Sequence, residues 1–345
     1  MRTDDFGTVK DGAKVCLYTI KNKNDMAVSV TNFGAALVKV LVPDKDGNLT
    51  DVVLGYDDAA GYEKGTASFG ASVGRNANRI GGASLEIQNV KYDLAKNDNG
   101  NNLHSGPDYY NKRIWETEEC KEDCVTFLLH SPDKDQGYPG SLDMRVTYEL
   151  TQENELKIYY HAVPDKDTII NMTNHSYFNL DGHKEGSVLK HKVEIDADYF
   201  TRADAESIPT GELTPVAGTP MDFRIPKELG LEIDADYEAV KLGLGYDHNW
   251  VLKTNGKFVK VAKAEGSHSG IVMEVRTDLP GIQMYTANFL QDEQGKDGAV
   301  YPKRSAVCFE TQYFPDAVHH DNFASPICEA GEIYDTVTSY KFSLR

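Results

Sequence analysis

Two segments of the sequence place a side chain that can transfer a proton inside an otherwise apolar run. One is residues 305–316, SAVCFETQYFPD, where Glu310 stands among aliphatic and aromatic residues. Burial in such surroundings disfavours the carboxylate and raises its pKa, which makes a glutamate a useful base near neutral pH. The alternative is a glutamate on an edge strand that faces water, and the local sequence leaves both interpretations open.

The second segment is residues 171–180, NMTNHSYFNL, with His175 at its centre. Successive side chains of a strand point to opposite faces, and every second residue here can form hydrogen bonds. That face carries Asn171, Thr173, His175, Tyr177 and Asn179. It suits the floor of a sugar-sized cleft, because lysine and glutamate, which are common on solvated faces, are absent. The alternative is a solvated outer face on which the histidine occurs by chance.

Two loop-like segments add polar groups that suit the recognition of hydroxyl groups. Asp247 lies in residues 245–252, GYDHNWVL, where a polar cluster leads into an apolar run. A carboxylate can accept two hydroxyl protons, although this aspartate could instead cap its own turn. His104 lies in the amide-rich loop 98–107, and loops often carry binding residues.

A glycine-flanked turn, residues 74–82, carries both Arg75 and Arg79. Two guanidinium groups in such a turn could clamp the oxygen atoms of a ligand. In the alternative interpretation they are surface charges or structural ion pairs. Gln283, in the sequence PGIQMY, is a further amide on an expected strand.

Strands are the elements expected to position these side chains. Apolar and polar residues alternate with a period of two in residues 26–31, 85–94, 156–162, 193–197 and 271–275. This alternation is typical of half-buried strands, and Asp-Gly and Asn-Gly turn signals separate them. Short helical patterns occur only near residues 226–229 and 236–240. We therefore predict an all-β fold, a large single-domain antiparallel β-sandwich over residues 1–345, with a two-domain split as the alternative.

The composition excludes several classes of function. The chain has 36 Lys and Arg residues against 54 Asp and Glu residues, a formal net charge of −18, which argues against nucleic acid and anionic membranes as partners. An apolar leader and an 18-residue apolar run are absent, and the five cysteines form no paired pattern, so a cytoplasmic protein with reduced thiols is expected. Metal-ligand spacings, phosphate loops and Gly-x-Ser-x-Gly elbows are also missing, so we expect neither metal nor cofactor.

Together, these segments resemble the aldose 1-epimerases, also called galactose mutarotases. The motifs, in the family's order, are GRNANRI at 74–80, NLHSG at 102–106, NHSYFNL at 174–180, GYDHN at 245–249, PGIQ at 280–283 and ETQYFPDA at 310–317. They span nearly the whole chain. The resemblance implies a β-sandwich enzyme that interconverts the α and β anomers of aldohexoses such as galactose and glucose, without a cofactor.

The resemblance also implies roles for single residues. Glu310 matches the base that takes the proton of the anomeric hydroxyl, and His175 matches the acid that protonates the ring oxygen. A nearby carboxylate, Asp247 or Glu310, should then support the charge of His175. Arg79 is a better match than Arg75 to the substrate-binding arginine. The predicted substrate-binding residues are Asn78, Arg79, His104, Ser176, Tyr177, Asp247 and Gln283. The expected partner is the aldose alone, bound by a monomer or homodimer.

Two other functions remain as alternatives. An epimerase for a phosphorylated hexose would need additional cations, and Arg75 is the only spare one within a motif. A non-catalytic sugar-binding module would need hydroxyl-binding residues, but not an acid and a base on opposite sides of one ring.

Overall fold

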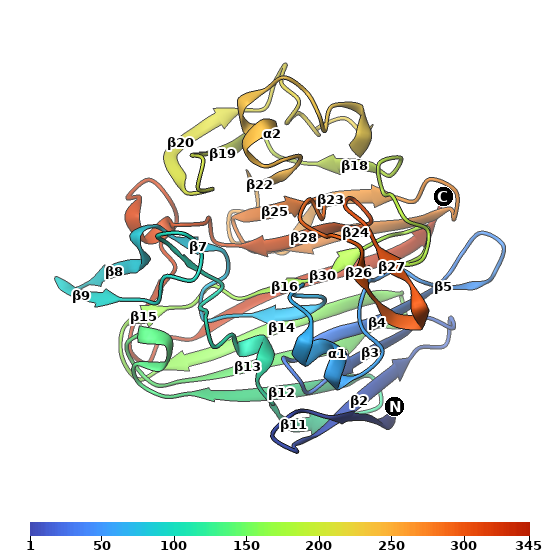
Figure 1. The fold of residues 1–345 in the computed structure, drawn as a ribbon, viewed down its shortest axis with the longest axis horizontal. Helices are drawn as coiled ribbons and strands as arrows, with labels where there is room; N and C mark the ends of the chain where they lie inside the picture. The colour runs from blue at the N-terminus through green and yellow to red at the C-terminus, as the bar shows by residue number, and fades with distance from the viewer.

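Antiparallel strands are the main secondary structure of the computed structural model, which describes residues 1–345. The largest sheet has nine strands (Figure 1). Across the sheet the strands are β11 (Glu116–Cys120), β12 (Cys124–Ser131), β13 (Leu142–Leu150), β14 (Glu155–Pro164), β30 (Tyr334–Leu344), β24 (Ile271–Thr277), β23 (Val259–Glu265), β18 (Lys192–Ile195) and β21 (Lys227–Glu228). In strand β14, buried side chains alternate with side chains that are partly or fully exposed, as the period-two pattern of residues 156–162 predicted.

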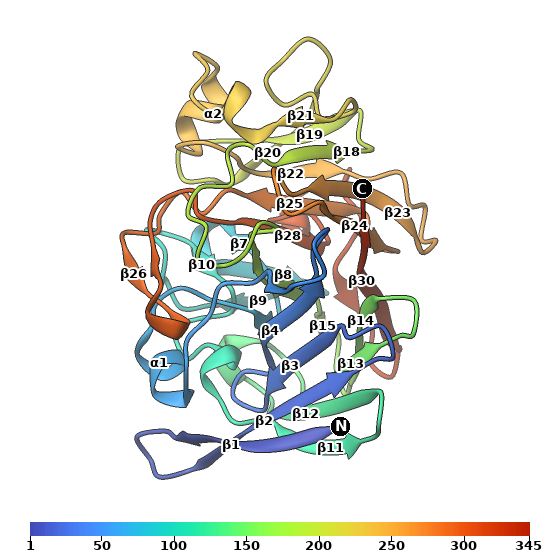
Figure 2. The ribbon, with the colours of Figure 1, turned by 90° about the vertical axis from the view of Figure 1, so that its right-hand side faces the viewer.

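Two further sheets complete the framework. The six-stranded sheet consists of β17 (Tyr177–Phe178), β28 (Val307–Gln312), β25 (Gly281–Tyr285), β22 (Asp247–Val251), β19 (Tyr199–Ala203) and β20 (Pro209–Pro215). The five-stranded sheet, blue in Figure 2, consists of β1 (Arg2–Thr8), β2 (Lys14–Lys21), β3 (Ala27–Thr31), β4 (Ala36–Pro43) and β5 (Leu49–Asp51). Most of the predicted site segments fall on the six-stranded sheet or on loops beside it.

A single cluster of 57 buried apolar residues joins the three sheets. It includes Val28 from the five-stranded sheet, Tyr148 and Ile158 from the nine-stranded sheet, and Ile282 and Phe309 from the six-stranded sheet. Neighbouring strands within these sheets pair antiparallel, for example β13 with β14 and β25 with β28. The predicted all-β antiparallel sandwich is therefore confirmed.

Short elements cover the rims of the sheets. The small two-stranded pairs are β6 (Ala71–Val73) with β16 (Thr173–His175), β7 (Arg79–Ile80) with β10 (Asn102–Leu103), β8 (Ser84–Ile87) with β9 (Val90–Asp93), β15 (Thr168–Ile169) with β29 (Ile327–Cys328), and β26 (Glu293–Gln294) with β27 (Val300–Tyr301). The helices are α1 (Ala59–Lys64) and α2 (Glu238–Leu242), and α2 lies close to one of the two predicted helical patterns. The other pattern instead forms β21 followed by a 3-10 turn at Leu229–Leu231. None of the helices is long and apolar enough to cross a membrane.

The 171–180 segment is not the single strand that its alternation predicted. It pairs with β6 up to His175 and with β28 from Tyr177 onward, so the chain changes partner at Ser176. This change brings His175 close to β28, the strand that carries Glu310. In Figure 2, α1 and β26 lie at the left edge of the molecule, beyond the sheets.

Candidate active site

One cavity of about 490 Å³ gathers residues from the six-stranded sheet and from the turns at β7 and β10. Eight of the nine predicted site residues line it: Asn78, Arg79, His104, His175, Tyr177, Asp247, Gln283 and Glu310. The ninth, Ser176, does not. Residues that are up to 232 positions apart in the sequence thus meet at one place, as the predicted site requires.

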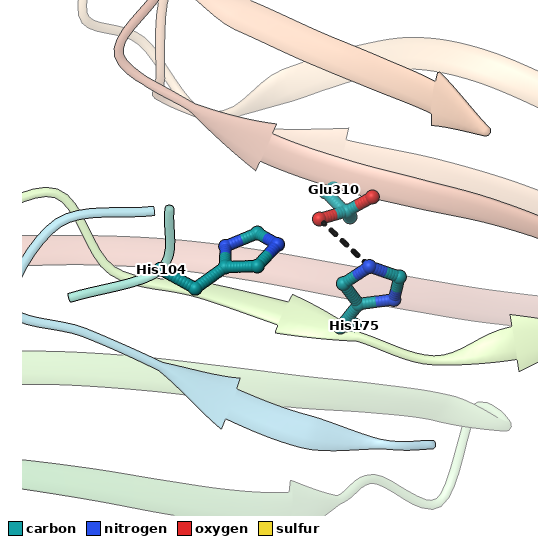
Figure 3. A group of neighbouring side chains, drawn as sticks. All are labelled: His104, His175 and Glu310. Atoms are coloured by element: carbon teal, nitrogen blue, oxygen red, sulfur yellow. Dashed lines mark ion pairs between the residues drawn. The ribbon is translucent and has the colours of Figure 1, made fainter. Parts of the chain in front are cut away.

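The carboxylate of Glu310 and the imidazole of His175 face each other inside this cavity. Nε2 of His175 lies 3.6 Å from Oε2 of Glu310 (Figure 3), and the two side chains are only 9% and 3% exposed. A pyranose ring cannot lie between groups this close, so the expectation of an acid and a base on opposite sides of a ring is wrong. Placed side by side, they can instead approach two oxygens bonded to one carbon.

Burial governs the protonation of this pair. Desolvation raises the pKa of the Glu310 carboxyl well above its usual value; nearby Asp247 raises it further, and Arg79 opposes the shift. Desolvation lowers the pKa of His175 to about 4. In the free protein, a single proton shared by the pair therefore rests on Glu310 and leaves the imidazole neutral. Glu310, not Asp247, is the carboxylate beside His175.

His104 presents a ring N–H to the cavity. Its Nδ1 accepts a hydrogen bond of 3.0 Å from the backbone N–H of Asn78, so the proton of the neutral ring is on Nε2. Burial, with His175 and Arg79 nearby, keeps the pKa of His104 well below its usual value. Positive φ angles of 62° at Asn78 and 52° at His104 shape the two turns that form this contact.

The spacing of His104, His175 and Glu310 also resembles that of a metal site. Their potential ligand atoms all lie within 4.8 Å of one another (Figure 3). The nitrogen of His104 that points toward Glu310 carries a hydrogen, because the other nitrogen already accepts from Asn78. Since a metal needs the free lone pair of that nitrogen, this donor set fits proton transfer and hydroxyl binding better than metal binding.

The two arginines of the 74–82 turn have different environments. Arg79 lines the cavity, and its Nε donates to Oδ2 of Asp98 at 2.7 Å. Arg75 lies outside the cavity and is fully buried. It donates to the carbonyl oxygens of Pro139 and Gly140, each at 2.8 Å. Arg75 therefore has a structural environment, although it is neither the surface charge nor the ion pair of the alternative interpretation.

Asp247 and Gln283 form a hydrogen-bonded pair on the neighbouring strands β22 and β25. Nε2 of Gln283 donates to Oδ1 of Asp247 at 2.7 Å. Burial raises the pKa of Asp247, whereas Arg79 and the bond from Gln283 lower it. The second carboxylate oxygen has no hydrogen-bond donor within the protein and can accept from a bound hydroxyl group.

Ser176 is the one predicted site residue that does not line the cavity. Its buried hydroxyl donates to Oδ1 of Asn174 at 2.5 Å. Only His175 and Tyr177 of the predicted polar face line the cavity, and their rings stack with centroids 5.0 Å apart. Asn171, Thr173 and Asn179 of the same face are buried elsewhere.

Sequence reasoning missed the outer wall of the cavity. It is built from Thr66 and Ser68, which follow α1, from Tyr285 at the end of β25, and from Phe289 and Glu293, which lie before and at the start of β26. Tyr285 could have been found, because it lies two residues after Gln283 on the same face of β25. The others lie in loops without a recognisable motif.

The chain matches the family described as aldose 1-epimerase over residues 16–341. It is 41% identical to the galactose mutarotase of Homo sapiens over 320 residues, which cover 92% of each chain. It is 36% identical to the aldose 1-epimerase of Escherichia coli strain K12, over 96% of each chain.

Two solved structures have the same fold. An aldose epimerase homologue from C. elegans superposes with a TM-score of 0.88 at 32% identity, covering 95% of this chain and 98% of that one. A galactose 1-epimerase from Lactobacillus acidophilus gives a TM-score of 0.86 at 29% identity, covering 99% and 98%. The chain therefore belongs to the aldose 1-epimerase family, a class of isomerases, and the family prediction is confirmed.

Proposed function

We propose that residues 1–345 act as one domain that interconverts the α and β anomers of aldohexoses such as galactose and glucose. The observation that carries this proposal is the buried pair of Glu310 and His175, 3.6 Å apart in a cavity lined by hydroxyl-binding side chains. Relatives named galactose mutarotase and aldose 1-epimerase support the choice of sugar.

Ring opening requires two coupled proton transfers. The shared proton first moves from Glu310 to His175, whose facing atoms lie 3.6 Å apart. Glu310, now a carboxylate, takes the proton of the C1 hydroxyl while the bond between C1 and the ring oxygen breaks, and His175 donates its proton to the ring oxygen. Both oxygens are bonded to C1, so an acid and a base that lie side by side can reach them together. The step leaves an open-chain aldehyde, a protonated Glu310 and a neutral His175, which is the proton distribution that burial favours.

Ring closure reverses these transfers. Rotation about the bond between C1 and C2 turns the other face of the aldehyde toward the attacking hydroxyl. His175 then takes the hydroxyl proton as the ring closes, and Glu310 protonates the former carbonyl oxygen. Each positioned acid or base contributes about 10²–10⁴ in rate. The remaining cavity residues hold the sugar hydroxyls: Asn78, Arg79, His104, Tyr177, Asp247 and Gln283.

The cavity disfavours a phosphorylated hexose as substrate. Arg79 is the only lysine or arginine that lines it, and this guanidinium is already paired with Asp98. Two further carboxylates that line the cavity, Asp247 and Glu293, would repel a phosphate. A merely sugar-binding module is also disfavoured, because hydroxyl recognition alone does not require a buried acid–base pair.

We further propose a cytoplasmic protein that works as a monomer or homodimer. All five cysteines are free, which suits a reducing compartment. A single chain supplies every residue of the cavity, so assembly is not needed to complete the site. The net charge of −18 supports the aldose as partner rather than nucleic acid or a membrane surface.

Polarimetry of freshly dissolved α-galactose, with and without the protein, tests the proposed function. We expect the protein to accelerate the approach to anomeric equilibrium in proportion to its concentration. Galactose bound without acceleration would support the binding module instead. Faster turnover of glucose 6-phosphate than of galactose would support the phosphohexose epimerase.

A further inference from the structure

Gln312 is a buried polar residue that the proposed reaction does not use. It lies two residues after Glu310 on β28, is fully buried and does not line the cavity. Its Nε2 donates to Oε1 of Gln283 at 3.4 Å and to Oδ1 of Asn249 at 3.2 Å. Gln283 in turn donates to Asp247 at 2.7 Å. Gln312 is thus the inner end of a chain of amides that leads to the cavity.

The hydrogen bonds of this chain can run in only one direction. A carboxylate only accepts, so the group of Gln283 that faces Asp247 must be its NH₂. The carbonyl oxygen of Gln283 then faces Gln312, so the group of Gln312 that donates to it must be the NH₂. Any flip of the Gln283 amide would set two oxygens 2.7 Å apart, because its carbonyl would then face the Asp247 carboxylate.

Strand pairing holds the members of the chain in place. Gln312 is opposite Gly281 in the ladder between β28 and β25, and Gln283 is opposite Asn249 in the ladder between β25 and β22. Added bulk at Gly281 would meet the Oδ1 of Asn249 at 2.5 Å, so this part of the sheet has no room to shift. The amides can rotate, but their positions are set.

The hydrogen-bonding groups around Gln312 are only partly paired, which is unfavourable for a residue with a purely structural role. Its own Oε1 and the Nδ2 of Asn249 are buried without a hydrogen-bond partner. An unpaired buried polar atom disfavours folding, so an apolar side chain would suit this position if packing were its only task. A glutamine here is better explained by the hydrogen bond that it supplies to Gln283.

We propose that Gln312 is a positioning residue that orients the Gln283 amide, and through it the Asp247 carboxylate, for binding the sugar hydroxyls. This inference rests on the proposed function of the cavity. Gln312 touches neither the substrate nor the reacting atoms. Its loss should therefore weaken sugar binding much more than it slows the proton transfers of Glu310 and His175.

Gln312→Met tests this role, because methionine has a similar length but cannot donate. We expect the KM for galactose to rise about tenfold, as expected for a lost orientation of polar contacts, while kcat falls less than about threefold. Thr311→Val is the matched control: it lies on the same strand, faces the opposite way and bonds to Thr338 rather than to the cavity. We expect normal KM and kcat in this control.

A double-mutant cycle separates positioning from general structure. If Gln312 acts through Gln283, Gln283→Met with Gln312→Met should have the same KM as Gln283→Met alone. The inference would be overturned if the two single-variant increases in KM multiplied in the double variant, or if Gln312→Met had a normal KM. Gln312→Leu provides a second variant if the methionine variant does not fold. Leucine also cannot donate to the carbonyl of Gln283, so the same rise in KM is expected, and a normal KM would contradict the inference.

Galactose affinity, measured by calorimetry on the same variants, distinguishes this inference from the proposed function. A wild-type protein that binds galactose without accelerating mutarotation would overturn the proposed function only. The loss of galactose affinity predicted for Gln312→Met would still be tested by the calorimetry, independently of that result.

Discussion

Two side chains, Glu310 and His175, carry the proposed chemistry, and their roles can be tested separately. Glu310→Gln keeps the size of the side chain and removes the base. We expect kcat for galactose to fall by about 10²–10⁴, with galactose binding largely retained. Polarimetry gives the rate and calorimetry the affinity. A near-normal mutarotation rate would remove Glu310 from the role of base.

Replacing the proposed acid should change both the rate and its dependence on pH. Activity requires one proton on the pair, so kcat/KM of the wild type should decline in acid as a second proton binds, consistent with a His175 pKa of about 4. In alkali it should decline as the single proton leaves. We expect His175→Asn to lose about 10²–10⁴ in kcat and to change this profile. An unchanged pH profile in that variant would exclude His175 as the acid.

Arg75 holds two separate elements together, because its side chain links the 74–79 turn to the segment around Pro139 and Gly140. Arg75→Met leaves these buried carbonyl oxygens without a donor. We expect the free energy of unfolding to fall by about 3 kcal/mol or more, with the KM for galactose nearly unchanged in the folded protein. Urea unfolding and polarimetry measure the two effects.

Arg202→Met is the control for this prediction. Its side chain is 45% exposed and pairs with Glu212 and Glu238 at the surface. Its loss should reduce the free energy of unfolding much less than the loss of Arg75, because exposed ion pairs contribute little to stability. Equal destabilisation by both variants, or a large KM increase in Arg75→Met alone, would contradict the structural role of Arg75.

The alternation of apolar and polar residues predicted where strands form better than it predicted which strands pair with each other. Strands appear where period-two patterns occur, for example β14 and β24, because one face of each packs on the core. The switch of sheets at Ser176 could not be predicted, since it depends on β6 and β28, which are remote in sequence. The same holds for the loop after α1 and for Phe289. They form the outer cavity wall only through the folded arrangement.

At the scale of the whole molecule, motif order predicted the family and the gathering of eight site residues. It did not predict how the acid and the base lie relative to each other, because side-by-side placement follows from a change of strand partner at one residue. The motifs favoured Arg79 over Arg75 as the substrate-binding arginine only because Arg79 matches the family better. One turn carries both residues, and the burial of Arg75 depends on packing in the folded protein.

Buried histidines should make the stability of the molecule sensitive to acid. Burial lowers the pKa of His175, His191 and His248 to about 4, so between about pH 6.5 and 4 the unfolded chain binds more protons at these sites than the folded one. Their contribution to stability is thus present above pH 6.5 and is lost as the pH falls toward 4. The raised pKa values of Glu310 and Asp247 act in the opposite direction.

A comparison of variants isolates the contribution of one histidine. His248 is buried beneath α2, where its Nε2 bonds to the carbonyl oxygen of Ala239. We expect His248→Asn to be less stable than the wild type at pH 7 but to lose less further stability between pH 7 and pH 5, as measured by urea unfolding. An equal or larger pH-dependent loss in the variant would contradict the assignment.

The crystal structure of Glu310→Gln with bound galactose would show whether the pair reaches the two oxygens on C1. We expect the C1 hydroxyl within hydrogen-bond distance of the side chain at position 310 and the ring oxygen within the same reach, about 2.6–3.2 Å, of Nε2 of His175. A galactose bound with C1 directed away from this pair, or outside the cavity, would contradict it.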